Sequence, residues 1–100
     1  MFFKTNTNIS RSEFERLYEE KGGMVVDCRT AMECASGTWP DAIQADWLGG
    51  ELHAKSSSWD KSTPIYCYCR SGARSGAAVQ FLKSIGFDEV YNLGGYSSLL

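Results

Sequence analysis

Short apolar runs alternate with segments of helical periodicity along this chain, and that alternation limits its fold more than any other feature. Runs typical of strands occupy residues 24–26, 42–45, 64–68 and 89–92, with a weaker one at 2–5. Helical patterns occupy residues 10–21, 30–37 and 75–85, and another begins at 46 and ends before a serine-rich loop expected at 55–63. Such alternation implies right-handed crossovers between parallel strands. We therefore expect an α/β fold with a central five-stranded parallel sheet flanked by helices on both faces.

Three of the predicted helices begin with a capping signal. Ser10 and Glu13 are placed as a capping box, in which each residue bonds the backbone NH of the other. Thr30 and Glu33 form a second box of the same kind. Asp46 is the predicted cap of the third helix.

One loop concentrates a thiol and positive charge between a predicted strand and a predicted helix. It contains Cys69, Arg70, Gly72 and Arg74, and Gly76 follows it. The reactive form of cysteine is the thiolate, which the positive end of the helix, the loop NH groups and the arginines would stabilise. The same groups would bind an anion beside the sulfur. We interpret the loop as an active site for a sulfur nucleophile and an anionic substrate.

A second segment is expected to approach this loop. Ligands of parallel sheets bind at the carboxyl ends of the strands. Asp27 and Cys69 both follow predicted strands, so the topology should bring residues 27–29 near Cys69.

The length of the loop indicates which anion it suits. Cysteine-dependent phosphatases place one residue more between the cysteine and the phosphate-clamping arginine than the four that separate Cys69 from Arg74. The shorter loop makes a tighter cradle, which favours an extra sulfur on the cysteine over a tetrahedral phosphate. A phosphate- or arsenate-directed cysteine enzyme is the less favoured alternative.

These motifs together resemble the rhodanese-like sulfurtransferases. The residues Cys69-Arg70-Ser71-Gly72-Ala73-Arg74-Ser75 look like the active loop of that family, and Ile65–Tyr68 is similar to the strand before it. The other segments that resemble family signatures, in the family's order, are Val25–Arg29 with Glu33, Gly37–Ile43, and Gly86–Val90 with Gly94–Gly95. Departures from the usual residues occur outside the active loop, at Thr38, Asp41 and Leu99. The resemblance covers nearly the whole chain and implies one rhodanese-like domain at residues 1–100.

The resemblance implies a two-step transfer of sulfane sulfur. Cys69 would attack the outer sulfur of thiosulfate or of a persulfide donor, and a thiol or cyanide would then take that sulfur from a Cys69 persulfide. A thioredoxin-like protein is one implied thiol acceptor, and no cofactor or metal is implied. Donor binding is assigned to the loop residues Arg70, Ser71, Gly72, Ala73, Arg74 and Ser75. Asp27 and Arg29 are implied as supporting residues, and Arg74 is expected to bind the donor more strongly than Arg70.

An alternative from a different class is a rhodanese-like module that binds a protein partner without catalysis. That role is suggested for family members that have lost the loop cysteine, whereas Cys69 is present here.

Composition argues against several other classes of protein. The net charge of −2 gives no basic field for nucleic acid. No apolar stretch reaches the roughly 18 to 20 residues of a membrane span, and the first residues lack the pattern of a signal peptide. We expect a cytoplasmic protein, periplasmic only if a signal peptide had been removed, with no nucleic-acid or membrane partner.

The remaining cysteines and the single histidine are interpreted as structural. Their spacing does not match a zinc site, and disulfides would require a secretory context. Cys67 is expected in the core, with a role as resolving thiol for Cys69 as its alternative, and Cys28 and Cys34 are ordinary thiols unless Cys28 couples to the site. His53 is expected on a solvated helix face. Arg29 and Glu33 are spaced as a surface helix pair.

Overall fold

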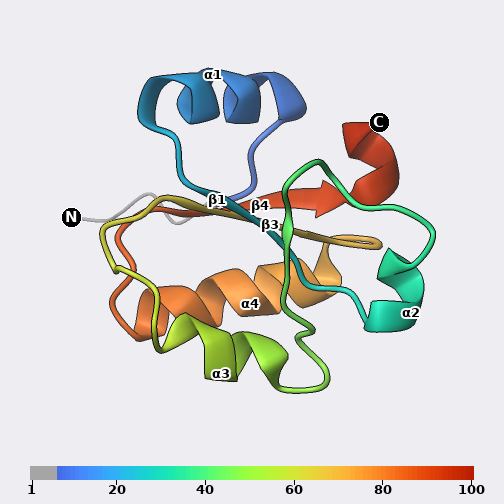
Figure 1. Ribbon diagram of the computed structural model, residues 1–100. Coiled ribbons are helices and arrows are strands. Elements are labelled where there is room, and N and C mark those ends of the chain that lie inside the picture. Colours follow the sequence, from blue (N-terminus) through green and yellow to red (C-terminus); the bar gives the residue numbers. More distant parts are fainter. Residues whose placement is uncertain (1–6) are drawn as a thin grey trace.

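The computed structural model describes residues 7–100 and contains a parallel sheet covered by helices on both faces (Figure 1). The sheet has four strands in the order β2-β1-β3-β4. Their bounds are Met24–Asp27 for β1, Ile43–Gln44 for β2, Ile65–Cys69 for β3 and Val90–Gly95 for β4. Every strand pair is parallel, as the alternation of patterns predicts.

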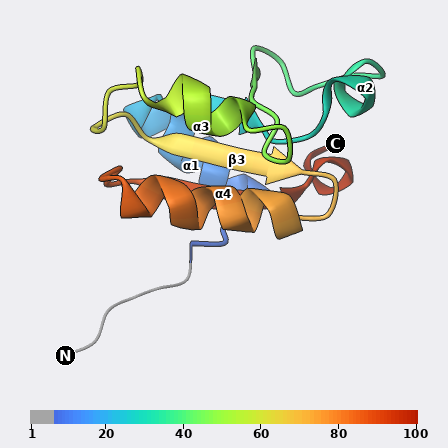
Figure 2. The same ribbon diagram turned by 90° about the horizontal axis from the view of Figure 1, so that it is seen from below.

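The helices form a layer on each side of the sheet. The helix α1 (Arg11–Lys21) covers one face, and α3 (Glu51–Ser56) and α4 (Ala73–Ser84) cover the other (Figures 1 and 2). The short α2 (Ala31–Cys34) and the 3-10 helix η1 (Tyr96–Leu99) lie at the end toward which the strands point. Within residues 7–100, no helix is both long and apolar enough to cross a bilayer.

The prediction of five strands is wrong, because the described sheet has four. The predicted strand at 2–5 lies outside the described residues. Just after it, the chain runs beside β4, where Asn8 forms one isolated parallel bridge with Asn92. The NH of Ile9 donates to the carbonyl of Asn92 at 3.1 Å, and the NH of Asn92 donates to the carbonyl of Thr7 at 2.8 Å. Within residues 7–100 this bridge does not extend into a ladder, so residues 7–9 do not count as a strand.

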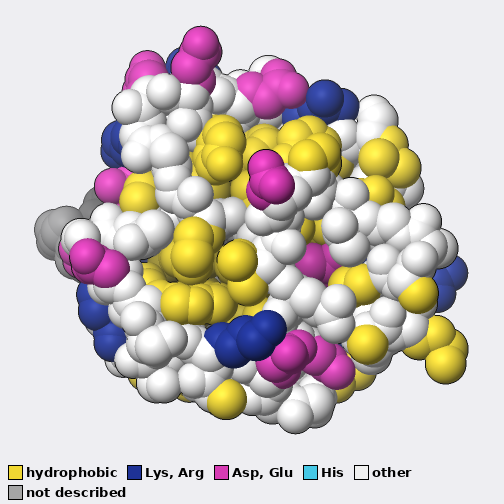
Figure 3. Space-filling model, viewed as in Figure 1, with side chains coloured by type: hydrophobic (Ala, Val, Ile, Leu, Met, Phe, Trp, Pro, Cys, Tyr) yellow, Lys and Arg dark blue, Asp and Glu magenta, His cyan; other side chains and the backbone are white. Residues whose placement is uncertain are grey.

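The apolar core has two layers because side chains of a strand alternate between faces. All five residues of β3 are buried. Tyr66 and Tyr68 point to the α1 side, whereas Ile65, Cys67 and Cys69 belong to the α3–α4 side. Apolar side chains remain visible at the surface between the two helical layers (Figure 3). A strand buried on both faces explains why its sequence is continuously apolar.

Local capping signals predicted two helices well and a third poorly. Ser10 accepts from the NH of Glu13 at the start of α1, and the capping box of Thr30 and Glu33 is complete at α2. Asp46 is not the cap of α3, which begins five residues later, at Glu51, after turns.

Two other boundaries in this region differ from the sequence prediction. Gly50 caps α3 with a left-handed φ of 83°. Helix α3 also continues into the predicted loop, and its last residue, Ser56, is buried.

Candidate active site

The Cys69 loop lies at the carboxyl end of β3, where the chain turns directly into α4. Gly72 adopts a left-handed φ of 102° and caps the helix, a conformation that favours glycine. Helix α4 therefore begins at Ala73, two residues earlier than the predicted start at 75. Arg74 and Ser75 consequently lie on its first turn, and Ser71 and Ala73 are exposed at its rim.

Hydrogen-bond donors converge on the sulfur of Cys69. The NH of Gly72 donates to Sγ at 3.0 Å, and the Ser75 hydroxyl lies 3.5 Å from the same atom. Burial acts to raise the pKa of the thiol, but hydrogen bonds from the Ser75 side chain and from the NH groups of Ser75, Gly72 and Ser71 outweigh it, so the pKa is lowered. A lowered pKa increases the share of nucleophilic thiolate at neutral pH.

Asn92 on β4 ties the middle of this loop to its last residue. Its Nδ2 donates to the carbonyl of Gly72 at 3.1 Å, and its Oδ1 accepts from the hydroxyl of Ser75 at 2.7 Å and the NH of Gly94 at 2.9 Å. A hydroxyl has one proton, so Ser75 donates either to Asn92 or to Cys69. The shorter distance favours donation to Asn92, so the backbone NH groups are the donors that bond the sulfur in either case.

Gly94 and Gly95 form the surface on which the loop rests. Both belong to β4, which extends beyond the strand predicted at 89–92, and Cys69 pairs with Gly95 after a register shift between Cys67 and Tyr68. A Cβ on Gly95 would overlap the carbonyl oxygen of Arg70 and would lie 3.4 Å from the Cα of Ser71. The loop can approach this closely only because no side chain stands at Gly95.

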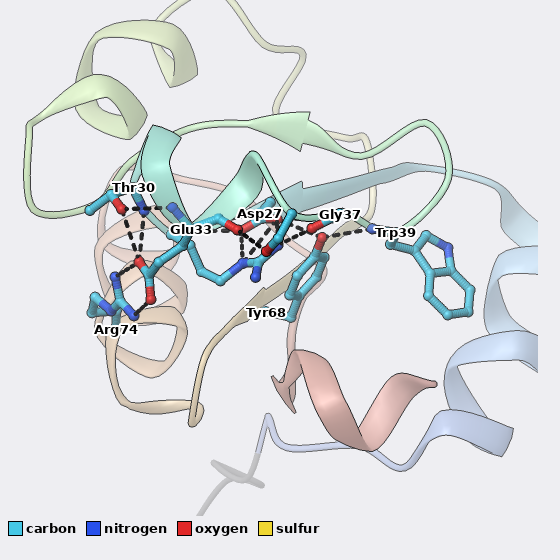
Figure 4. A network of polar contacts seen from close by, with 9 residues as sticks. Asp27, Thr30, Glu33, Gly37, Trp39, Tyr68 and Arg74 are labelled. Carbon is cyan, nitrogen blue, oxygen red and sulfur yellow. Dashed lines mark hydrogen bonds and ion pairs between the residues drawn. The ribbon is translucent and has the colours of Figure 1, made fainter.

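A buried ion pair supports the neighbouring strand end (Figure 4). Asp27 is wholly buried and accepts from Arg29 Nε at 2.9 Å and Nη2 at 2.7 Å, while the Tyr68 hydroxyl donates to it at 2.6 Å. Burial acts to raise the pKa of Asp27, but these hydrogen bonds prevail and lower it. Arg29 also donates to the carbonyl of Gly37 at 2.7 Å and lies over the ring of Tyr96 at 4.5 Å. The Asp27–Arg29 pair thus connects the end of β1 with the loop at Gly37 and with η1 at Tyr96, beside the end of β3.

The two loop arginines differ in their partners. Nη1 and Nη2 of Arg74 donate to the two carboxylate oxygens of Glu33 at 2.8 and 2.9 Å (Figure 4). Arg70 is exposed, and no side chain among the described residues forms an ion pair with it. The predicted surface pair of Arg29 and Glu33 is wrong, because Arg29 turns inward to Asp27 and Glu33 turns to Arg74.

The other cysteines are free thiols buried in the structure. Cys28 and Cys67 share the core layer of Cys69. A side-chain hydrogen bond with Cys67 and burial both raise the pKa of Cys28, which opposes thiolate formation there. His53 is exposed, as predicted, and its ring stacks on Trp47 with the centroids 4.7 Å apart.

We expect iodoacetamide to alkylate Cys69 with a pH midpoint below that of an unperturbed thiol, about 8.5. The reason is the lowered pKa of this group. Ser75→Ala should raise the midpoint by less than about one unit, because the NH of Gly72 still donates to sulfur. Peptide mass spectrometry across pH would measure this. Cys34, whose pKa burial and the nearby Asp27 raise to about 11, is the internal comparison. Equal midpoints for the two thiols would contradict the prediction.

The structure brings the loop and the segment 27–29 to the same edge, as expected from the topology. Sequence reasoning missed the roles of Asn92 and Gly95, since it placed Asn92 only in a strand and Gly95 only in a segment that resembles a family signature. It also missed that Glu33 holds Arg74. The complete Thr30–Glu33 capping box was the one available signal, since it fixes Glu33 at the sheet's carboxyl end.

Comparisons with known proteins agree with this arrangement. The family described as rhodanese-like domain matches residues 10–100. A sulfurtransferase of Allochromatium vinosum is 37% identical over 86 residues, which cover 86% of this chain and 78% of that protein. A tRNA uridine(34) hydroxylase of Corynebacterium urealyticum is 33% identical over 96 residues, and this match covers 89% of the chain but only 32% of that protein. The crystal structure of a rhodanese-like domain protein from Staphylococcus aureus has a TM-score of 0.80 and 27% identity, covering 94% of this chain and 91% of that chain.

Proposed function

The chain belongs to the rhodanese-like domain family, and on that basis we propose that it is a sulfurtransferase whose nucleophile is Cys69. The observation that carries the proposal is the Cys69 sulfur itself, which receives the NH of Gly72 at 3.0 Å and has a lowered pKa. The Allochromatium vinosum relative, which bears the name sulfurtransferase, supports the same reaction class.

In the proposed first step, the Cys69 thiolate attacks the outer sulfur of thiosulfate or of a persulfide. A sulfur–sulfur bond forms on Cys69 while the donor's own sulfur–sulfur bond breaks, and sulfite or a thiolate leaves with that electron pair. In the second step, a thiolate or cyanide attacks the outer sulfur of the Cys69 persulfide and Cys69 leaves as thiolate. The loop NH groups stabilise negative charge on sulfur in both steps. Asp27 and Arg29 position the strand end and do not transfer protons.

Movement of groups around Cys69 is a necessary part of this proposal. Cys69 has no exposed surface. A donor therefore reaches the sulfur only after a group that covers it moves aside.

The test is the intact mass of the protein after incubation with a panel of sulfane-sulfur donors. We expect the mass to increase by one sulfur atom, and a following thiol or cyanide should remove it. Cys69→Ser should show no gain, and Cys67→Ser should gain sulfur normally, because Cys67 is a core thiol. Absence of the gain with every donor would refute sulfur transfer.

A second candidate is binding of a protein partner without catalysis, and the complete burial of Cys69 is the observation that favours it. If this were the role, Cys69→Ala would keep the wild-type biological activity while no donor sulfurated the wild-type protein. The relatives named tRNA uridine(34) hydroxylase suggest a tRNA-related setting, but the chain spans 32% of the one compared here. We therefore assign only the sulfur-transfer step to these residues.

A further inference from the structure

The charges around the Cys69 loop do not favour a doubly charged donor. Arg74 is one of two cations of the loop, and its two terminal nitrogens are already engaged with Glu33 at 2.8 and 2.9 Å. A fork that holds one carboxylate in two parallel bonds cannot offer the same bonds to a sulfonate. Arg70 is therefore the loop cation that remains free for a donor, which reverses the order of Arg74 and Arg70 expected from the sequence.

Glu33 is fixed in place and is not a mobile surface carboxylate. Its Oε1 accepts from the NH of Thr30 at 3.0 Å and from the Thr30 hydroxyl at 3.1 Å, so the capping box of α2 orients it. The hydrogen bonds from Arg74, and then those from Thr30, lower the pKa of Glu33 to about 2, so it is ionised at neutral pH. Displacing Glu33 from Arg74 would break the ion pair and disturb the capping box at the start of α2.

A further carboxylate adds to the negative charge. Asp46 follows β2 at the same end of the sheet, and its Oδ1 is buried without a hydrogen-bond partner among the described residues. Arg74 has a raised pKa, first because of its hydrogen bond with Glu33 and also because of the charges of Cys69 and Asp46. The charge of Arg74 is thus neutralised by Glu33, and Asp46 adds a second carboxylate at the same end of the sheet.

From this arrangement we infer that Glu33 determines donor specificity, and that it selects persulfides of low charge over the thiosulfate dianion. The inference rests on the proposed sulfur transfer and narrows it to one donor class. With a persulfide RS–SH, the Cys69 thiolate attacks the terminal sulfur, the RS–SH bond breaks, and RS⁻ leaves while the proton stays on the transferred sulfur. No sulfonate has to be accommodated beside Glu33 and Asp46.

The test compares single-turnover sulfuration of Cys69 by two donors, thiosulfate and the persulfide of uncharged N-acetylcysteamine. Glu33→Gln removes one negative charge and weakens the hold on Arg74, so it should raise the thiosulfate rate about tenfold and change the persulfide rate less than about twofold. Glu15→Gln is the matched control, since Glu15 pairs with Arg11 on exposed α1 and the variant changes net charge equally. This control should leave the ratio of the two rates unchanged.

A second measurement needs no variant. If the wild-type site repels a dianion, added salt will screen the repulsion and raise the thiosulfate rate, whereas the persulfide rate will change less. An equal effect of Glu33→Gln on both donors, or a thiosulfate rate that falls with salt, would overturn the inference while leaving sulfur transfer intact. If neither donor sulfurates Cys69, the proposed function fails and the inference fails with it.

Discussion

Replacing Asp27 by Asn is expected to lower the free energy of unfolding by about 3 to 5 kcal/mol at neutral pH. Asp27 is fully buried, and its carboxylate is the counter-ion of the Arg29 guanidinium at 2.7 Å. Asn keeps the shape and an acceptor for the Tyr68 hydroxyl, but it leaves the charge of Arg29 buried without its partner. Urea denaturation of both proteins at the same pH would measure the difference.

Glu89→Gln is the matched control for this prediction. Glu89 pairs with Lys21 at the same N–O distance of 2.7 Å, but the side chains are 32% and 44% exposed. An exposed pair contributes at most about 1 kcal/mol, so the control should lose no more than that. Similar losses in the two variants would show that burial does not decide the strength of the Asp27–Arg29 pair.

The stability that Asp27 contributes should also depend on pH. Its pKa is lowered in the folded protein, although burial alone would raise it, because hydrogen bonds from Arg29 and Tyr68 prevail. Because the pKa of Asp27 is lower in the folded protein than in the unfolded chain, where it is about 3.9, the ionised carboxylate stabilises the folded state above that pH. This stabilisation is lost as the pH falls through the pKa of the folded protein. The difference in the free energy of unfolding between wild type and Asp27→Asn should therefore be largest at pH 7 and should shrink below about pH 4. A gap that widens on acidification would contradict this sign.

Local signals predicted those parts of the fold that short stretches of chain determine. The capping residues Ser10 and Thr30 act within three residues of themselves, so the sequence shows where α1 and α2 begin. The start of α3 could not be predicted in this way, because Asp46 is a good cap by type but the following turns delay the helix to Glu51. The prediction of five strands was wrong for a related reason. Whether the bridge at Asn8 extends into a strand depends on pairing with β4, which is distant in the sequence.

The sequence predicted those parts of the candidate site that lie within one short segment. The spacing of Cys69, Gly72 and Arg74 identifies the loop because neighbouring residues define its chemistry. The partner of Arg74 is 41 residues away, and pairing across such a separation depends on how the crossovers pack. Asn92 has no local mark of function either, since its hydrogen bonds with Gly72 and Ser75 exist only when β4 lies beside β3.

Replacing Gly95 by Ala is expected to reduce the proposed sulfur transfer about a hundredfold, the scale of loss for a misplacement of about 1 Å in an active site. Gly95 has an ordinary φ of −90°, so alanine suits its backbone and the effect is steric alone. The new Cβ would overlap the carbonyl oxygen of Arg70, and the loop would have to move off β4. That movement would withdraw the NH of Gly72 from the Cys69 sulfur. Two measurements should therefore change together: the single-turnover rate should fall, and the pH midpoint for alkylation of Cys69 should rise.

Gly50→Ala separates this steric effect from a general loss of stability. Gly50 has a left-handed φ of 83°, and a Cβ there would meet no atom within 4 Å. Alanine at this position should cost about 1 kcal/mol through backbone strain, because that region disfavours residues with a Cβ. The rate of sulfur transfer and the alkylation midpoint should remain those of the wild type, since α3 does not carry the loop. If both variants lost activity in proportion to their stability, contact between Gly95 and the loop would not be what holds the Cys69 sulfur among its donors.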